Sequence, residues 1–188
     1  MQSLKLFMLM VGCRPAGRNT EQHDIMFGIG ETIKDLVPAI NAFWPEAKGN
    51  IHVDAWREVT QVDGFSVEVV SKEESITNDE NANKLFFLNL GGYKIGEFDE
   101  FHYKMLAVSA DQAGAIKQAK LTAFYKHTGF KGATSHIDDK FGVDVDEFHE
   151  VKEILPENIK QKYSLRITPN NAVTEDEMHL GYFQLHKL

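Results

Sequence analysis

The sequence has little of what defines many classes of protein. Its 188 residues include one cysteine, Cys13, so no disulfide can form within the chain, and we expect a reducing compartment. No apolar run approaches the roughly 20 residues that a membrane-spanning helix needs. Basic residues are the minority, with 20 against 28 acidic residues and a formal net charge of −8. This balance argues against binding to nucleic acid or to an anionic membrane.

Motifs that mark common catalytic and cofactor sites are also missing. The sequence has no His-Glu-x-x-His zinc motif and no glycine-rich phosphate loop followed by Lys-Ser or Lys-Thr. The acidic residues at 138–147, Asp146 among them, lack the spacing of a calcium loop, so we interpret them as turn and surface acids. Cys13 is the only candidate thiol nucleophile, and we expect it to pack as a small apolar side chain.

The sequence does contain nearly the same segment twice. A shift of 79 positions superposes the segment that begins at Lys5 on the one that begins at Lys84, with 9 identities in 22 aligned positions. Average residue usage gives about one or two identities. A shorter third match begins at Leu165 and includes Glu177 and His179. The sequence therefore predicts a fold built from repeated units.

Each unit is expected to run strand, strand, helix, strand, strand. In the first unit, residues 4–12 and 22–29 predict strands, and the apolar spacing at residues 31–44 predicts an amphipathic helix that Pro38 interrupts. In the second unit, Ser109 and Gln112 resemble a capping box, and Gly129 is expected to end the helix. Residues 59–70 and 143–151 are expected to supply the closing strands.

We therefore expect an α+β protein with a pseudo-twofold arrangement. The repeated units are residues 1–70 and 84–156, joined by a polar linker at residues 71–83. Residues 157–188 are expected to form a truncated third repeat or a capping β-hairpin that completes the sheet. The apolar N-terminal run resembles a short lipoprotein signal, but it recurs at residues 84–92, so we expect a cytoplasmic protein.

Ionisable residues recur in pairs two positions apart, a spacing that puts both side chains on the same face of a strand. Each Glu-x-His pair presents a carboxylate beside an imidazole, and a His-x-Asp pair follows each predicted helix. The pairs are Glu21 with His23, His52 with Asp54, Glu100 with His102, His136 with Asp138, and Glu177 with His179.

Three interpretations of these pairs stay open in the sequence. Glu21, His23, Glu100 and His102 could hold a divalent metal such as Zn, Mn or Fe, completed by the other pairs. A histidine held by a carboxylate could serve as a general acid or base. The carboxylates could instead orient the histidines within structural networks, which is a common role of paired ionisable residues.

The loop after the first predicted strand offers a weaker candidate site. Arg14 and Arg18 could receive an anion together with the backbone amides around them. In the second copy those arginines are replaced by Tyr93 and Glu97. The glycines that recur in both copies are predicted to need a positive φ; they are Gly12 with Gly91 and Gly17 with Gly96.

Several motifs resemble the bacterial domain-of-unknown-function family 1543. They are Gly-Cys-Arg-Pro, Glu-Gln-His-Asp and His-Val-Asp-Ala-Trp between Leu6 and Val70, and Leu-Gly-Gly-Tyr, Glu-Phe-His-Tyr, Phe-Tyr-Lys-His-Thr-Gly and His-Ile-Asp-Asp between Lys84 and Leu155. Members of that family carry one or two copies of the domain, so the resemblance implies a tandem two-copy intracellular bacterial protein. It implies no activity, cofactor or catalytic residue.

The sequence favours a binding module over an enzyme. We expect Glu21, His23, Glu100 and His102 to converge on a cleft between the repeats that takes a small molecule or a protein partner. The alternative is a metal-dependent or His/carboxylate hydrolase that uses the Glu-x-His pairs. Neither nucleic acid nor membrane is an expected partner, and exposed sheet edges are compatible with a homodimer.

Overall fold

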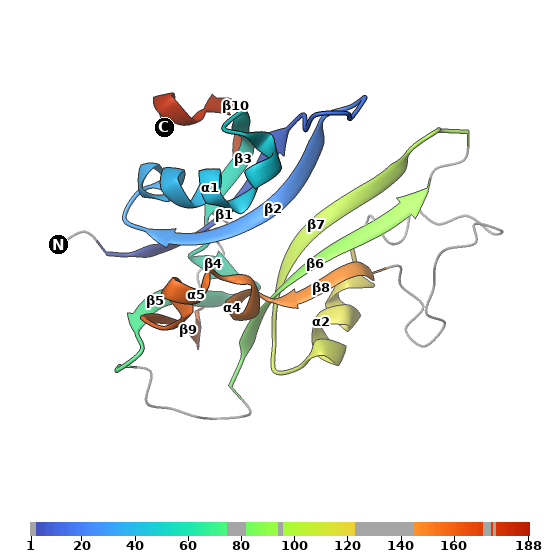
Figure 1. Ribbon diagram of the computed structural model, residues 1–188. Helices are drawn as coiled ribbons and strands as arrows, with labels where there is room; N and C mark the ends of the chain where they lie inside the picture. Colours follow the sequence, from blue (N-terminus) through green and yellow to red (C-terminus); the bar gives the residue numbers. More distant parts are fainter. Residues whose placement is uncertain (1–2, 75–81, 94–95, 123–144, 171–173, 175) are drawn as a thin grey trace. The chain divides into compact units, whose positions relative to one another are not determined.

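A computed structural model of the protein describes residues 3–74, 82–93, 96–122, 145–170, 174 and 176–188 (Figure 1). The chain divides into two compact units, residues 1–77 with 155–188, and residues 78–154. The C-terminal residues 155–188 therefore belong to the first unit, although the whole second unit separates them from residues 1–77 in the sequence. Each unit has its own antiparallel sheet and its own apolar core.

The main sheet of the first unit has four antiparallel strands in the order β10-β3-β1-β2. The central strand β1 is apolar at most positions, and its alternate residues Phe7, Leu9, Val11 and Cys13 face the core of the first unit. The expected strands near residues 4–12 and 22–29 are both present. The four strands are β1 (Lys5–Cys13), β2 (Gln22–Gly30), β3 (Ile51–Glu58) and β10 (His179–Gln184).

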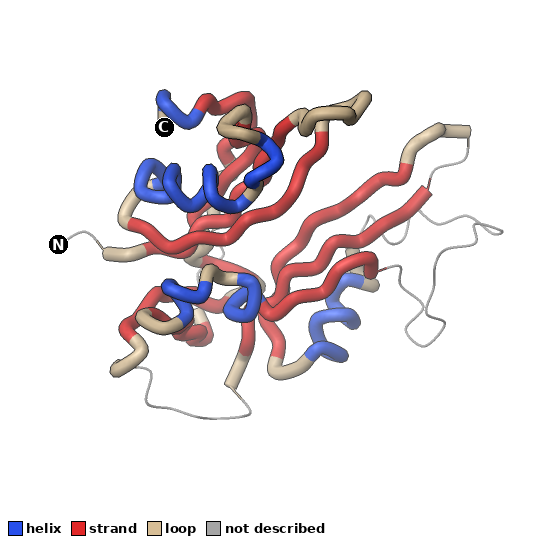
Figure 2. Tube along the Cα trace, in the orientation of Figure 1, coloured by secondary structure: helices blue, strands red, loops and turns tan. Residues whose placement is uncertain are grey.

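Short helical segments follow β2 and cover one face of this sheet (Figure 2). Leu36 and Ile40 pack with Phe7 and Leu9 in the core of the first unit. Gly28 leaves room for this packing, since a Cβ atom there would lie 2.9 Å from a methyl carbon of Leu36. The segments are η1 (Ile33–Leu36), α1 (Val37–Phe43) and η2 (Pro45–Ala47).

The start of this helical region explains how the sequence accommodates Pro38. Thr32 and Asp35 form a capping box, in which Asp35 accepts a 2.8 Å hydrogen bond from the backbone N–H of Thr32. The hydrogen bonds from Thr32 and Glu31 lower the pKa of the Asp35 carboxyl. Pro38 then falls in the first turn of α1 rather than mid-helix, where its missing N–H leaves no hydrogen bond unmade.

A smaller sheet completes the first unit, with strand order β4-β5-β9. Asp63 and Gly64 join β4 to β5 with φ values of 52° and 79°, a conformation that suits a tight hairpin turn. The elements here are β4 (Gln61–Val62), β5 (Phe65–Ser71), the short helix α5 (Glu157–Lys160) and β9 (Tyr163–Pro169), and the chain ends in η3 (Leu185–Lys187) after β10.

The second unit has a three-stranded antiparallel sheet in the order β7-β6-β8, with a helix packed on it. Asp111 caps that helix by accepting a 2.8 Å hydrogen bond from the N–H of Gly114. The predicted cap at Ser109 is therefore displaced by two residues, and Gly129 lies outside the described residues. The elements are β6 (Lys84–Tyr93), β7 (Glu100–Ser109), α2 (Gln112–Ala119), β8 (Val145–Glu150) and α4 (Val151–Ile154).

The predicted α+β class is confirmed, whereas two finer expectations are wrong. β9 pairs with β5 and β10 pairs with β3, so the C-terminal strands join two different sheets instead of forming a hairpin. Val151, expected in a closing strand, begins the helix α4. The strand-strand-helix-strand-strand repeat and its pseudo-twofold arrangement stay predictions. Within the described part of the chain, no helix is both long and apolar enough to cross a membrane.

Candidate functional site

The candidate site of the first unit begins with a row of residues across its main sheet. Gly12 of β1 lies opposite His23 of β2 on one side and opposite His52 of β3 on the other. Residues directly opposite each other in antiparallel strands project from the same face. Because Gly12 has no side chain, the two imidazoles flank an open space above the middle strand.

A β-bulge in β3 adds a carboxylate to this space. The pairing of β1 with β3 shifts register between Met10 and Val11, which leaves Asp54 as the extra residue of the bulge. A Cβ atom at Gly12 would overlap Oδ2 of Asp54 and would lie 2.6 Å from Nε2 of His52. A side chain at position 12 would therefore force both groups to move from these positions.

Four side chains meet at this position, and we call Glu21, His23, His52 and Asp54 the first cluster. Oδ2 of Asp54 lies 3.3 Å from Nε2 of His23 and 3.2 Å from Nε2 of His52. Oε1 of Glu21 lies 3.1 Å from Nε2 of His52, and its Oε2 lies 3.9 Å from Nε2 of His23. The structure thus brings together both predicted pairs of the first unit.

The first cluster has a buried floor and an open rim. Only 7% of the His52 side chain and 21% of the Asp54 side chain are exposed, against 41% for His23 and 45% for Glu21. Nε2 of His52 and Oδ2 of Asp54 are buried, and neither makes a hydrogen bond. Leaving buried polar atoms unpaired typically costs about 1–3 kcal/mol each, so this arrangement requires an explanation.

The C-terminal segment contributes a cover to the buried histidine. The ring centroid of Tyr182 lies 4.3 Å from that of His52, with the planes tilted by 34°. A register shift between Leu180 and Phe183, with Gly181 at a φ of 141°, brings Tyr182 to this position. Sequence reasoning missed Tyr182 because nothing in its local pattern signals a long-range contact with β3.

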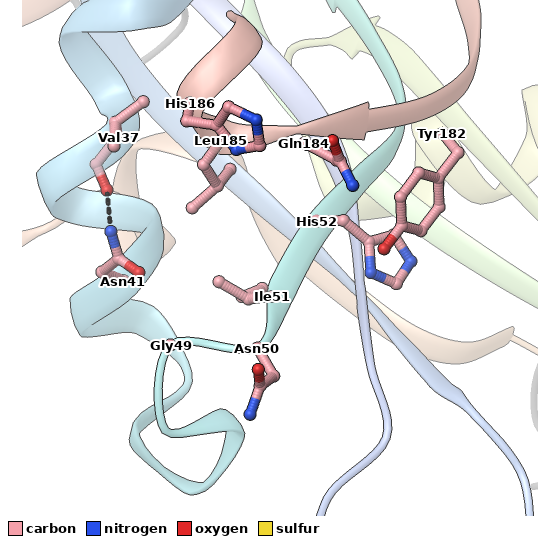
Figure 3. Close-up of a pocket in the computed structure, with 10 residues that line it drawn as sticks. All are labelled: Val37, Asn41, Gly49, Asn50, Ile51, His52, Tyr182, Gln184, Leu185 and His186. Atoms are coloured by element: carbon pink, nitrogen blue, oxygen red, sulfur yellow. Dashed lines mark hydrogen bonds between the residues drawn. The ribbon is translucent and has the colours of Figure 1, made fainter.

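A pocket of about 570 Å³ lies next to this cover (Figure 3). Figure 3 shows the side chain of Ile51 on one side of β3 and the rings of His52 and Tyr182 on the other. The pocket belongs to the first unit, and the predicted cleft between the repeats stays a prediction. The residues that line the pocket are Val37, Asn41, Gly49, Asn50, Ile51, His52, Tyr182, Gln184, Leu185 and His186.

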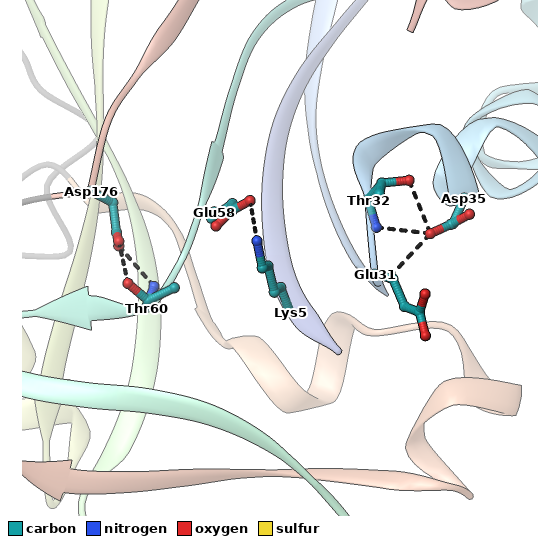
Figure 4. Close-up of polar contacts among 7 residues, drawn as sticks. All are labelled: Lys5, Glu31, Thr32, Asp35, Glu58, Thr60 and Asp176. Carbon is teal, nitrogen blue, oxygen red and sulfur yellow. Dashed lines mark hydrogen bonds and ion pairs between the residues drawn. The ribbon is translucent and has the colours of Figure 1, made fainter. Parts of the chain in front are cut away.

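Asp176 fixes the segment that leads into β10 (Figure 4). Its carboxylate accepts hydrogen bonds from the backbone N–H groups of Thr60 and Gln61, at 2.8 and 3.0 Å, and from the Thr60 hydroxyl. His179 then stacks on Trp56, with ring centroids 3.8 Å apart. The histidine of the third predicted pair therefore serves to pack β10 on β3.

The second unit contains a related set of side chains. Gly91 of β6 lies opposite His102 of β7, and the pairing of β6 with β8 shifts register next to Leu90, which leaves Asp146 as the extra residue. Nε2 of His102 lies 3.0 Å from Oδ2 of Asp146. We call Glu100, His102 and Asp146 the second cluster, in which one ligand atom from each residue lies within 4.8 Å of the others.

Asp146 is exposed, as predicted for a surface acid, but it lies in the strand β8 rather than in a turn. It takes the place in the bulge of β8 that Asp54 takes in the bulge of β3. The signal in the sequence is a second match, because Asp144-Val145-Asp146 has the spacing of His52-Val53-Asp54. The predicted second pair, His136 with Asp138, lies outside the described residues.

The recurring glycines serve two different purposes. Gly17 and Gly96 both have a φ of 81°, which confirms the predicted need for a left-handed conformation. For Gly12 and Gly91 that prediction is wrong, because both lie within strands and have carboxylate oxygens where a Cβ atom would be. Their function is to allow a close approach to the backbone.

The remaining candidates from the sequence are Arg14, Arg18 and Cys13, and the anion site at the two arginines stays a prediction. Arg14 donates a 3.3 Å hydrogen bond from Nε to the carbonyl oxygen of Arg18, and both residues are exposed. Cys13 is buried, and burial raises the pKa of its thiol, with the nearby negative charges of Glu21 and Glu46 raising it further. A thiol with a raised pKa is a poor nucleophile.

The fold and the site define an α+β protein with antiparallel sheets and a histidine–carboxylate cluster on the main sheet of its first unit. Residues 18–69 match the family described as Domain of Unknown Function (DUF1543), which confirms the resemblance for this segment. The segment includes all four residues of the first cluster. Two-copy membership stays a prediction.

One solved structure has the same fold over nearly the whole chain. It is the crystal structure of the protein Il1583 from Idiomarina loihiensis, with a TM-score of 0.65 and 21% sequence identity, covering 97% of this chain and 98% of that chain. At this identity the likeness shows the fold alone. No curated protein matches the sequence.

Proposed function

We propose that the protein is a metal-binding module whose first cluster holds a divalent transition-metal ion. The observation that carries this proposal is the pair of buried atoms Nε2 of His52 and Oδ2 of Asp54, which lie 3.2 Å apart although neither makes a hydrogen bond of good geometry. A cation between them would accept both lone pairs and remove the cost of burying them. His23 and Glu21 supply further ligands at the open rim.

Three separations within the first cluster match those between neighbouring ligands of one ion. With metal–ligand bonds of about 2.0–2.2 Å, two ligands are about 2.8–3.1 Å apart at octahedral angles and about 3.3–3.6 Å apart at tetrahedral angles. The separations from Asp54 to the two imidazoles are 3.2 and 3.3 Å, and that from Glu21 to His52 is 3.1 Å. Glu21 Oε2 and His23 Nε2 are 3.9 Å apart, and the described residues do not include three ligand atoms of the first cluster that all lie within 4.8 Å of one another, so its side chains must move closer together to bind one ion.

The chemistry of the ligands indicates the kind of metal. Imidazole suits Zn, Fe, Ni and Cu, whereas an all-oxygen set suits Mg or Ca. Two imidazoles with two carboxylates therefore favour Zn²⁺ or Fe²⁺. The aromatic ring of Tyr182 limits the freedom of His52, and such orientation of a ligand from outside the first coordination sphere strengthens metal sites.

Metal-dependent hydrolysis is the second candidate function. The observation that favours it is the exposure of the rim, where 41% of His23 and 45% of Glu21 are accessible. A metal held here would keep room for water, and a bound metal can lower the pKa of water enough to make hydroxide near neutral pH. Substrate screening belongs after metal binding has been measured.

The proposal is tested by metal analysis and by Zn²⁺ titration of chelator-stripped protein. We expect one equivalent of Zn²⁺ to bind at the first cluster and to raise the Tm, and we expect that equivalent and its contribution to the Tm to be lost in His52→Gln and in Asp54→Asn. The matched control is His149→Ala, which removes an exposed histidine of β8 that belongs neither to the first cluster nor to the lining of its pocket.

The Tm of each metal-free variant separates loss of a ligand from loss of the fold. A variant that folds without metal and binds one equivalent of Zn²⁺ less than the wild-type chain supports the proposal. Wild-type affinity in a folded Asp54→Asn protein, or no Zn²⁺ binding by the wild-type chain, would overturn it.

A further inference from the structure

We infer that the second cluster is a separate metal site, with a greater relative preference for Mn²⁺ than the first. It goes beyond the proposed function, which concerns the first unit. The three ligand atoms, one each from Glu100, His102 and Asp146, lie within 4.8 Å of one another. All three residues belong to strands of the second unit, so its geometry does not depend on the first.

The backbone beneath the second cluster is shaped for a carboxylate. A Cβ atom at Gly91 would overlap Oδ2 of Asp146 and would lie 2.9 Å from both its Cγ and its Oδ1. The whole carboxylate group therefore rests on the backbone of β6. The bulge of β8 holds Asp146 in that position, beside the imidazole of His102 at 3.0 Å.

The second cluster differs from the first in its ligand types. The first cluster has two imidazoles and two carboxylates, whereas the described residues of the second offer one imidazole and two carboxylates. His102 is the counterpart of His23, with 34% of its side chain exposed against 41%, and it is far less buried than His52, which is 7% exposed. In the first cluster the buried nitrogen of His52 is the donor that most favours Zn²⁺. The described residues of the second cluster include no histidine that is buried to this extent.

These differences predict the metal preference. Carboxylate and water ligands suit Mn²⁺ and Mg²⁺, and a single imidazole favours Mn²⁺ over Mg²⁺. Divalent affinities rise from Mn²⁺ to Zn²⁺ at most sites, so both sites can accept Zn²⁺. The quantity that distinguishes them is the ratio of the Mn²⁺ to the Zn²⁺ dissociation constant, which we expect to be smaller at the second cluster.

The test is a titration of the full, chelator-stripped chain with Mn²⁺ alone, in which free Mn²⁺ is counted by electron paramagnetic resonance. We expect Asp146→Asn and His102→Ala each to weaken Mn²⁺ binding at least about tenfold, because even outer-shell changes cost that much. The matched control, His149→Ala, removes an exposed histidine from the same strand and should leave binding unchanged. Zn²⁺ titrations of the same variants give the second dissociation constant.

The outcomes separate this inference from the proposed function. Mn²⁺ binding that is lost in Asp146→Asn and retained in Asp54→Asn supports a second site. Mn²⁺ binding that is lost only in Asp54→Asn, or unchanged in a folded Asp146→Asn protein, overturns the inference and leaves the first site intact. If Mn²⁺ binding is lost only in the second-cluster variants and the first cluster binds no Zn²⁺, the further inference stands and the proposed function is rejected. The stated preference would be overturned if the ratio of the Mn²⁺ to the Zn²⁺ dissociation constant at the second cluster equals or exceeds that at the first cluster.

Discussion

At the scale of the residue, Gly12 and Gly91 are important because the absence of a side chain leaves space for the groups of the two clusters. Gly12 leaves room for Asp54 and His52, and Gly91 leaves room for Asp146, so three chemically important groups rest on bare backbone. Neither glycine has a conformation that forbids other residues, since both lie in regular strands. The restriction on these positions is therefore one of space.

A pair of alanine substitutions tests this distinction. Gly12→Ala should displace the cluster, lower Zn²⁺ affinity at least about tenfold and destabilise the fold by about 1–3 kcal/mol through overpacking. Gly17→Ala, where nothing lies within 4 Å of the added atom but φ is 81°, should cost about 1–2 kcal/mol and leave Zn²⁺ affinity unchanged. Calorimetric titration and urea unfolding measure the two quantities. Equal Zn²⁺ affinities in the two variants would contradict the role given to Gly12.

Sequence reasoning found the pairs of the first cluster for a clear physical reason. Two residues on one strand share a face when they are two positions apart, so Glu21 with His23 and His52 with Asp54 could be paired from spacing alone. That His23 and His52 flank the same glycine depends on strand register, which local spacing does not contain. Asp146 was missed because a bulge changes which residue faces the site.

At the scale of the element, β10 is the strand whose place the sequence predicted least well. Its neighbour in sequence is β9, but it pairs with β3, whose edge it covers. A strand pairs where an edge is free and apolar contacts are available, and Phe183 and Leu185 pack against the core of the first unit. Which of several strand edges β10 pairs with depends on long-range contacts, and a local sequence pattern contains no information about them.

The anchor of β10 can be tested by removing one carboxylate. Asp176→Ala leaves the N–H groups of Thr60 and Gln61 without their acceptor, so we expect a loss of about 1–3 kcal/mol in the free energy of unfolding. Glu177→Ala, at the exposed neighbouring position, should change it by less than about 0.5 kcal/mol. Urea unfolding of the metal-free proteins measures both. Equal stability of the two variants would show that the contacts of Asp176 do not hold the segment.

At the scale of the whole molecule, the two units carry separate cores and separate clusters. The core of the first unit is built around Phe7, Leu9 and Ile40, and that of the second around Leu88 and Leu90. Each cluster draws all its ligands from its own unit. A metal bound to one cluster should therefore stabilise that unit directly.

Hydrogen exchange read by mass spectrometry tests this separation. Zn²⁺ at one equivalent should slow exchange in peptides from β1 to β3, and Mn²⁺ added to Asp54→Asn protein should slow exchange in β6 to β8, because each metal stabilises the state that binds it. His149→Ala should reproduce the wild-type pattern. Protection by Mn²⁺ spread equally over both units of Asp54→Asn would contradict separate sites.

The position of β10 also has a consequence for synthesis. Thr60, at the end of the β3 region, and Asp176, which anchors β10, are separated by 116 residues. At roughly 5–20 residues per second, the ribosome makes that interval in about 6–23 s. During this time β1, β2 and β3 have already emerged while one edge of their sheet is bare, and the entire second unit is made before the covering strand arrives. The nascent chain thus exposes an unpaired strand beside His52 for many seconds, and the first unit is the last part of the molecule to be finished.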